Sequence, residues 1–129
     1  MKHTILLIED NEQNRYLATF LLEKAGYAVI PASDGQLGIQ LAARVLPQLI
    51  LLDIQLPTMD GYAVASALRS NPLLADIPIV AVTSYAMVGD REKALAAGCN
   101  GYLEKPIDPD TFVAEVERFL PVARKEPTL

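Results

Sequence analysis

Short apolar runs bounded by turn residues alternate along the chain with longer stretches in which apolar residues recur at helical spacing. The runs are continuous in apolar character, which is typical of strands that are covered on both faces of a sheet. They predict five strands, at residues 4–8, 28–30, 49–52, 79–82 and, more weakly, 102–103. The pattern therefore favours a doubly wound α/β domain, in which helices cover both faces of a parallel sheet.

Five helices are predicted between and after these strands. Their apolar positions recur every three or four residues, at 17–25, 37–45, 64–68, about 88–97 and 112–120. Gly26 and Gly98 each follow a predicted helix, at a position where a left-handed residue commonly ends it. Asp108 is expected to cap the last helix, with Pro109 in its first position.

A single domain is expected, because 129 residues can bury one core and neither a repeat nor a linker interrupts the pattern. Residues 1–121 are assigned to this domain, and residues 122–129 to a flexible C-terminal tail. No apolar run approaches the roughly 18 residues that a membrane span needs, and the first residues lack a secretory cleavage site. The cytoplasm is the expected compartment, and no membrane partner is expected.

Charge and cysteine content exclude several kinds of chemistry. A formal net charge of −5 argues against direct nucleic-acid binding, which usually needs a basic patch. Cys99 is the only cysteine, so an internal disulfide and a thiolate metal cage are excluded. The only histidine, His3, precedes the first strand, where ligand or general-base chemistry is not expected.

Chemically distinctive side chains follow four of the five predicted strands. In an open parallel sheet the ligand site lies beyond the carboxyl ends of the strands. The residues at these ends are Glu9 and Asp10, then Asp53, then Thr83 and Ser84, and finally Lys105. If the first and third strands are neighbours, three carboxylates converge on one crevice.

Three converging carboxylates require a cation. Two unit charges a few ångströms apart repel each other by about 1 to 4 kcal/mol at moderate effective dielectric, and each acid alone is an ordinary turn residue. Oxygen ligands without cysteine or histidine favour Mg²⁺, or Mn²⁺, over zinc. Because Mg²⁺ usually keeps waters and a phosphate oxygen beside one or two carboxylates, the set also implies a phosphate.

This set of residues resembles the receiver domain of two-component response regulators. The matching positions are Glu9-Asp10, Asp53 with Leu56-Pro57 and Asp60-Gly61, Thr83, and Lys105-Pro106. The resemblance extends over about residues 3–121 and is greatest to stand-alone receivers of the DivK type, although receivers fused to kinases or cyclases can look similar. It implies a (βα)5 fold with strand order 2-1-3-4-5.

The resemblance implies a phosphorylation-dependent signalling switch rather than an enzyme that acts on outside substrates. Asp53 would accept a phosphoryl group from a histidine kinase or a histidine phosphotransfer protein, so that the chain catalyses only its own phosphorylation and dephosphorylation. Mg²⁺, or Mn²⁺, would be bound by Asp10, Asp53 and the backbone carbonyl of Gln55, with Glu9 acting mainly through a coordinated water. Lys105 would pair with one phosphoryl oxygen.

The resemblance also implies how the signal leaves the domain. The hydroxyl of Thr83 would donate to a phosphoryl oxygen, and Tyr102 would occupy the space that Thr83 leaves. The face made by the fourth helix, the fifth strand and the fifth helix would then bind a downstream protein. The alternative for Tyr102 is a half-buried tyrosine that packs at the sheet edge. Lys105-Pro106 is a candidate cis peptide, as the family often has.

Two further positions are expected to tune the lifetime of the phosphorylated state. Gln55 and Tyr85 each lie two residues beyond a site residue, where they would flank the path of the hydrolytic water. A ring at position 85 would shield the acyl phosphate, so decay should be slower than in Tyr85→Ala.

Other classes of protein share parts of this pattern. A phosphatase of the haloacid-dehalogenase type carries its nucleophile on the first strand and an acid two residues later, where this chain has Gln55. A flavodoxin-like carrier needs a hydroxyl-rich loop after the first strand, where Asp10 and Glu12 would repel phosphate. A receiver that only docks, without phosphorylation, is a third alternative. The sequence leaves the kinase, the target and the choice between monomer and weak homodimer open.

Overall fold

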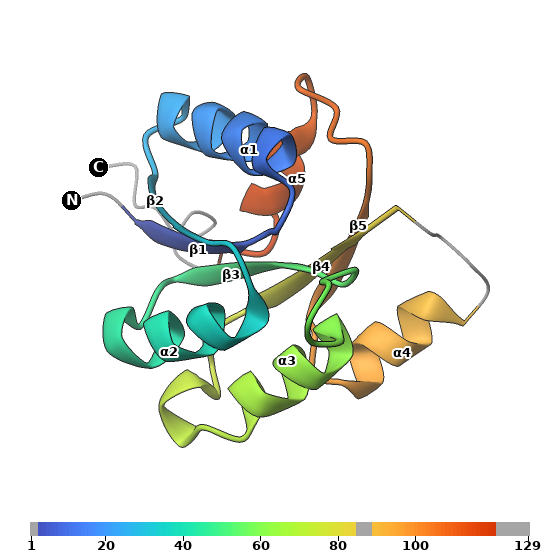
Figure 1. Ribbon diagram of the computed structural model, residues 1–129. Helices are drawn as coiled ribbons and strands as arrows, with labels where there is room; N and C mark the ends of the chain where they lie inside the picture. Colours follow the sequence, from blue (N-terminus) through green and yellow to red (C-terminus); the bar gives the residue numbers. More distant parts are fainter. Residues whose placement is uncertain (1–2, 85–88, 121–129) are drawn as a thin grey trace.

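A computed structural model of the chain describes residues 3–84 and 89–120 (Figure 1). Five parallel strands form one sheet in the order β2-β1-β3-β4-β5. The strands are β1 (Thr4–Ile8), β2 (Ala28–Ala32), β3 (Leu49–Asp53), β4 (Ile79–Thr83) and β5 (Gly101–Glu104). The predicted doubly wound α/β fold and its strand order are confirmed.

Helices alternate with the strands along the described residues and cover both faces of the sheet. They are α1 (Glu12–Lys24), α2 (Gly35–Val45), α3 (Gly61–Arg69), the short 3-10 helix η1 (Pro72–Leu74), α4 (Asp90–Ala96) and α5 (Phe112–Glu117). α1 and α5 lie on one face, and α2, α3 and α4 lie on the other (Figure 1). This arrangement leaves the carboxyl ends of the strands open along one edge of the domain.

Two apolar layers hold the helices against the sheet. Alternate residues of β3 point to opposite layers, because successive side chains of a strand face opposite ways. Leu49 and Leu51 pack in the layer of α1 and α5, whereas Ile50 and Leu52 pack in the layer of α2, α3 and α4. All four side chains are fully buried. Burial on both faces explains why the sequence of β3 is a continuous apolar run.

Several element boundaries differ from the prediction. β2 continues to Ala32 and includes Pro31, which is tolerated because β2 has a neighbour on one side only. The predicted cap of α5 is wrong: the helix begins at Phe112, and Thr111 occupies the N-cap position. The carboxylate of Asp108 instead accepts from the N–H of Asp110 at 2.9 Å. A separate turn therefore leads into α5.

The two predicted helix-ending glycines have the expected backbone. Gly26 has a φ of +102° and Gly98 a φ of +106°, values that L side chains rarely adopt. Within the described residues, no helix is both long enough and apolar enough to cross a bilayer. The predicted tail, residues 122–129, lies outside the described residues.

Candidate functional site

The central strand β3 carries Asp53 to the carboxyl edge of the sheet. Asp53 is the last residue of the strand, pairs in register with Val82 of β4, and is 3% exposed. Its Oδ1 accepts a hydrogen bond from the backbone N–H of Gln55 at 2.9 Å. The carboxylate is thereby fixed at the rim of the sheet, where one of its faces can meet a ligand.

A close backbone approach fixes the turn that follows Asp53. The N–H of Gly61, the first residue of α3, donates to the carbonyl of Ile54 at 3.1 Å. A Cβ atom at position 61 would lie 2.7 Å from the carbonyl oxygen of Ile54 and 2.9 Å from that of Asp53. Only glycine fits here without moving the backbone beside the acid.

The loop after β1 brings a second carboxylate toward Asp53. Glu9 is 4% exposed, and its Oε2 accepts from the N–H of Asn11 at 3.1 Å. Arg15 of α1 donates through Nη1 to the carbonyl oxygens of Glu9 at 2.9 Å and Asp10 at 3.3 Å. The sequence reasoning missed Arg15, because no motif marks a side chain that contacts backbone carbonyls one turn away.

Lys105 pairs with two of the acids. Its Nζ lies 3.0 Å from Oε1 of Glu9 and 3.3 Å from Oδ2 of Asp53, and its side chain is 10% exposed. The backbone N–H of Lys105 donates to the carbonyl of Thr83 at 2.8 Å, which extends the pairing of β4 with β5. The Lys105-Pro106 peptide bond is cis.

Negative charge exceeds positive charge at this edge of the sheet. Carboxylate oxygens of Glu9, Asp10 and Asp53 all lie within 4.8 Å of one another. Burial, followed by the contact with Glu9, raises the pKa of Asp53 above its usual range. Partial burial and the neighbouring Asp53 likewise raise the pKa of Asp10. Three acids around one ammonium group, all offering hard oxygen ligands, fit a divalent cation such as Mg²⁺.

Thr83 ends β4 beside these charges. It is 2% exposed, and its Oγ1 accepts from Nε2 of Gln55 at 2.7 Å. Oε1 of the same glutamine accepts from the backbone N–H of Ser84 at 3.1 Å. The sequence reasoning used Gln55 for its backbone carbonyl and its position, and did not foresee these side-chain contacts. Tyr85 lies outside the described residues, so its effect on lifetime stays a prediction.

Tyr102 lies on the same face of the sheet as Thr83. In the pairing of β4 with β5, Ala81 is opposite Tyr102 and Thr83 is opposite Glu104, and residues two apart in a strand share a face. Tyr102 is partly buried and packs against the layer of α2, α3 and α4. The arrangement is compatible with a switch residue and equally with simple packing at the sheet edge.

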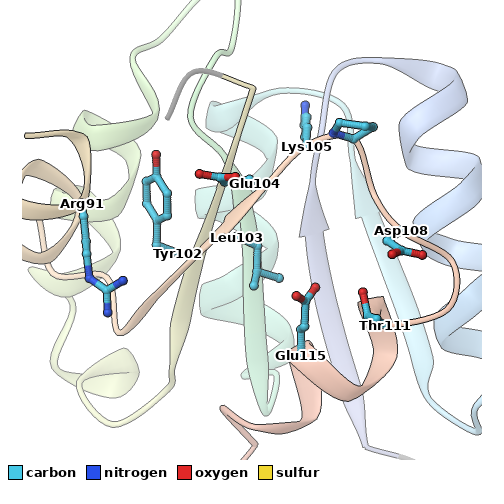
Figure 2. Close-up of a pocket in the computed structure, with 9 residues that line it drawn as sticks. Arg91, Tyr102, Leu103, Glu104, Lys105, Asp108, Thr111 and Glu115 are labelled. Atoms are coloured by element: carbon cyan, nitrogen blue, oxygen red, sulfur yellow. The ribbon is translucent and has the colours of Figure 1, made fainter. Parts of the chain in front are cut away.

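A cavity of about 660 Å³ opens on the side of the sheet formed by α4, β5 and α5. Figure 2 shows Arg91 and Tyr102 on the α4 side of this cavity, with Thr111 and Glu115 on the α5 side. Lys105 also lines the cavity, so the cavity and the acidic cluster share a residue. The shared lysine joins the charged edge to the face that was predicted to bind a downstream protein.

Comparison with known proteins assigns the family. The response regulator receiver domain family matches residues 5–117. The polar-differentiation response regulator DivK of Brucella anthropi is 38% identical over 120 residues, which cover 93% of this chain and 98% of that protein. The chain therefore belongs to the response regulator receiver domain family.

Solved structures of related domains agree with this assignment. The chemotaxis response regulator CheY4 of Vibrio cholerae matches with a TM-score of 0.88 and 27% identity, covering 93% of this chain and all of its own. The receiver domain of the sensor histidine kinase PA1611 of Pseudomonas aeruginosa matches with a TM-score of 0.85 and 35% identity, over 93% and 98% of the two chains. That structure has a magnesium ion coordinated in its active-site cleft.

The family assignment decides between the classes that the sequence left open. The chain is a receiver-type signalling regulator, and the acidic cluster of Glu9, Asp10 and Asp53 fits a phosphorylation site. The phosphatase and the cofactor carrier are not supported. In agreement with this, the candidate nucleophile Asp53 ends β3, and the residue two positions later is Gln55.

Proposed function

We propose that the chain is a phosphorylation-dependent switch whose phosphoacceptor is Asp53. The strongest support is that three carboxylates lie within 4.8 Å of one another beside Lys105. One of them, Asp53, is held by the central strand. The phosphoryl donor would be a phosphohistidine on a sensor kinase or a phosphotransfer protein. Because such kinases take their phosphate from ATP, we place the reaction in the cytoplasm.

The proposed reaction is a transfer between two side chains. A carboxylate oxygen of Asp53 attacks phosphorus, the P–N bond to the donor imidazole breaks, and its electron pair returns to the ring nitrogen. The hydrogen bond from the N–H of Gln55 to Oδ1, at 2.9 Å, orients the carboxylate for this attack. Such transfer depends mainly on alignment and on offsetting charge, so it needs no additional base.

Charge compensation would come from two sources. Asp10, Asp53 and the backbone carbonyl of Gln55 would hold Mg²⁺ directly, with Mn²⁺ as an alternative, and Glu9 would act through a coordinated water. When bound, the ion would offset the charge that the nucleophile and the phosphoryl oxygens bring together. Lys105, already 3.3 Å from Oδ2 of Asp53, would contact a phosphoryl oxygen as a point charge.

The proposed output runs through the β4–β5 side of the sheet. The hydroxyl of Thr83 would donate to a phosphoryl oxygen, and Tyr102, on the same face, would follow its movement. The face of α4, β5 and α5, which carries the cavity shown in Figure 2, would then change its affinity for a downstream protein. Which kinase and which target are involved depends on surfaces beyond this edge.

Intact mass spectrometry after incubation with acetyl phosphate and Mg²⁺ tests the proposal. The wild-type chain should gain a single phosphoryl group, and Asp53→Asn should gain none. Asp60→Asn is the matched control, because Asp60 is an exposed acid whose carboxylate caps α3 through the N–H of Tyr62. Phosphoryl incorporation in Asp53→Asn would contradict the assignment, and no incorporation in the wild type would favour a receiver that only docks.

A further inference from the structure

The side chain of Gln55 ties the loop after β3 to the end of β4. Its Nε2 donates to Oγ1 of Thr83 at 2.7 Å, and its Oε1 accepts from the backbone N–H of Ser84 at 3.1 Å. Its backbone N–H donates to Oδ1 of Asp53 at 2.9 Å. One residue thus contacts the candidate phosphoacceptor, the last residue of the neighbouring strand β4 and the residue that follows that strand.

The chemistry of the partners fixes the orientation of this amide. A backbone N–H can only donate, so the oxygen of Gln55 must face Ser84. The amide nitrogen then faces Thr83, and Oγ1 of Thr83 must act as the acceptor. Both polar ends of the glutamine are therefore engaged within the protein, which distinguishes it from an ordinary solvated glutamine on a loop.

These contacts oppose a movement of Thr83. The threonine is 2% exposed, and a shift of its hydroxyl toward a phosphoryl group on Asp53 would lengthen the 2.7 Å bond to Gln55. Gln55 cannot simply follow, because its backbone is bonded to Asp53 and its amide oxygen to Ser84. The phosphoryl group and the glutamine therefore compete for the position of Thr83.

We propose that Gln55 is a positioning residue that holds Thr83 and Ser84 in the resting arrangement and so sets the threshold of the switch. The inference rests on the proposed phosphorylation of Asp53 and adds to it a determinant of the resting state. It differs from an effect on the hydrolytic water, because it acts before any phosphoryl group is present. Its consequence is that losing the glutamine amide makes the activated arrangement easier to reach.

Binding of trifluoroberyllate, a non-hydrolysable stand-in for the phosphoryl group, tests this at saturating Mg²⁺. Gln55→Met keeps the backbone carbonyl and nearly the same side-chain length, but removes both hydrogen bonds. Because each such bond contributes modestly, Gln55→Met should bind trifluoroberyllate about two- to tenfold more tightly than the wild type. Before the probe is added, its Ser84 amide and Thr83 methyl resonances should already be shifted toward their bound positions.

A double-mutant cycle separates positioning from a general loss of structure. In a Thr83→Val background the hydroxyl is absent, so Gln55→Met should change the affinity less than it does in the wild-type background. If Gln55 had a purely structural role, its loss would weaken trifluoroberyllate binding. Equal or weaker binding by Gln55→Met would therefore overturn this inference but leave the proposed phosphorylation site in place. So would an effect of full size in the Thr83→Val background. Absence of binding by the wild type would instead overturn the phosphorylation site, and the inference with it.

Discussion

Two shielded cations lie at opposite ends of the sheet and have very different surroundings. At the carboxyl end, Lys105 is paired with Glu9 and Asp53 at 3.0 and 3.3 Å, within an acidic cluster that one ammonium group cannot neutralise. At the amino end of β4 and β5, the guanidinium of Arg69 donates to neutral oxygens. The shortest contacts are with the backbone carbonyl oxygens of Gly98 at 2.8 Å, Leu74 at 2.9 Å and Ile77 at 2.8 Å, and with Oδ1 of Asn100 at 2.5 Å.

The difference between the two ends distinguishes a candidate ligand site, around Lys105, from a structural support, the hydrogen-bond network around Arg69. Each guanidinium nitrogen of Arg69 donates to a carbonyl or amide oxygen, so the charge at this end of the sheet lies within a hydrogen-bond network of the protein itself. Lys105 lies among acids whose charge is left in excess. Burial, followed by the contact with Glu9, raises the pKa of Asp53. Excess negative charge on residues that the strands hold in place fits a divalent cation and the proposed phosphoryl group.

The largest expected effect concerns the support. Arg69→Ala should lower the free energy of unfolding by about 2–4 kcal/mol, because several partly buried oxygens lose a charged donor. Urea denaturation measures this change. The exposed Arg44, in the last turn of α2, is the control, and Arg44→Ala should change stability by less than about 0.5 kcal/mol. The same loss of stability from both variants would remove the contrast between Arg69 and a surface arginine.

The next effect concerns the site. Lys105→Met should slow phosphorylation by acetyl phosphate by about tenfold to a hundredfold, because a charged contact to the transferring group is lost. Mg²⁺ affinity should not fall, since the cluster becomes more negative. The rate follows from a time course of intact mass. Lys93→Met is the matched control, because Lys93 is an exposed residue of α4. A large loss of stability with an unchanged rate would mean that Lys105 is a support like Arg69.

Much of the candidate site can be predicted from the sequence, because apolar runs locate the ends of the strands. The strand ends predict four side chains at the carboxyl edge, and the structure has them there: Glu9, Asp53, Thr83 and Lys105. The strand order itself was not derivable from periodicity and came from the family resemblance. A run of apolar residues specifies which face is buried, but not which strand lies beside it.

The contacts that the sequence did not provide depend on loop geometry and side-chain rotamers. The bond from Gln55 to Thr83 joins residues 28 positions apart, and nothing in either local pattern requires it. The bonds from Arg15 to two carbonyl oxygens depend on how the loop before α1 folds back. The Asp108 cap failed for a related reason, because the aspartate satisfies a nearer N–H in a turn of its own.

A third prediction uses the raised pKa values of Asp53 and Asp10. Without metal, the folded protein binds protons more readily than the unfolded chain, so its stability should decrease as pH rises through the raised pKa values. Protons also compete with Mg²⁺ for these carboxylates. The stabilisation by a fixed concentration of Mg²⁺ should therefore grow as the pH rises from the usual aspartate pKa of about 4 toward neutrality. Urea denaturation with and without Mg²⁺ measures it.

Asp53→Asn supplies the control for this pH dependence, because the amide does not titrate and is a weaker metal ligand. The difference between denaturation with and without Mg²⁺ should then be small and nearly independent of pH. A wild-type difference that stays constant across the same range would contradict the coupling of these two acids to the metal.

The smallest expected effect concerns Arg15, the part of the site that resembles the Arg69 network. Arg15→Met removes the donors to the carbonyls of Glu9 and Asp10 but leaves every carboxylate in place. Mg²⁺ affinity should fall by about two- to fivefold, as the loop after β1 loses its restraint. Mg²⁺ titration followed by NMR measures it. Unchanged affinity would mean that the loop is held by its backbone contacts alone.

Pro31 in β2 has a consequence for how these domains behave next to one another. It lies in the outermost strand of the sheet, at a position that has no amide hydrogen to offer. A neighbouring copy that tried to extend the sheet at this border would meet a gap in the row of donors. The outer border of β2 therefore disfavours the merging of two sheets into a longer one when copies crowd together.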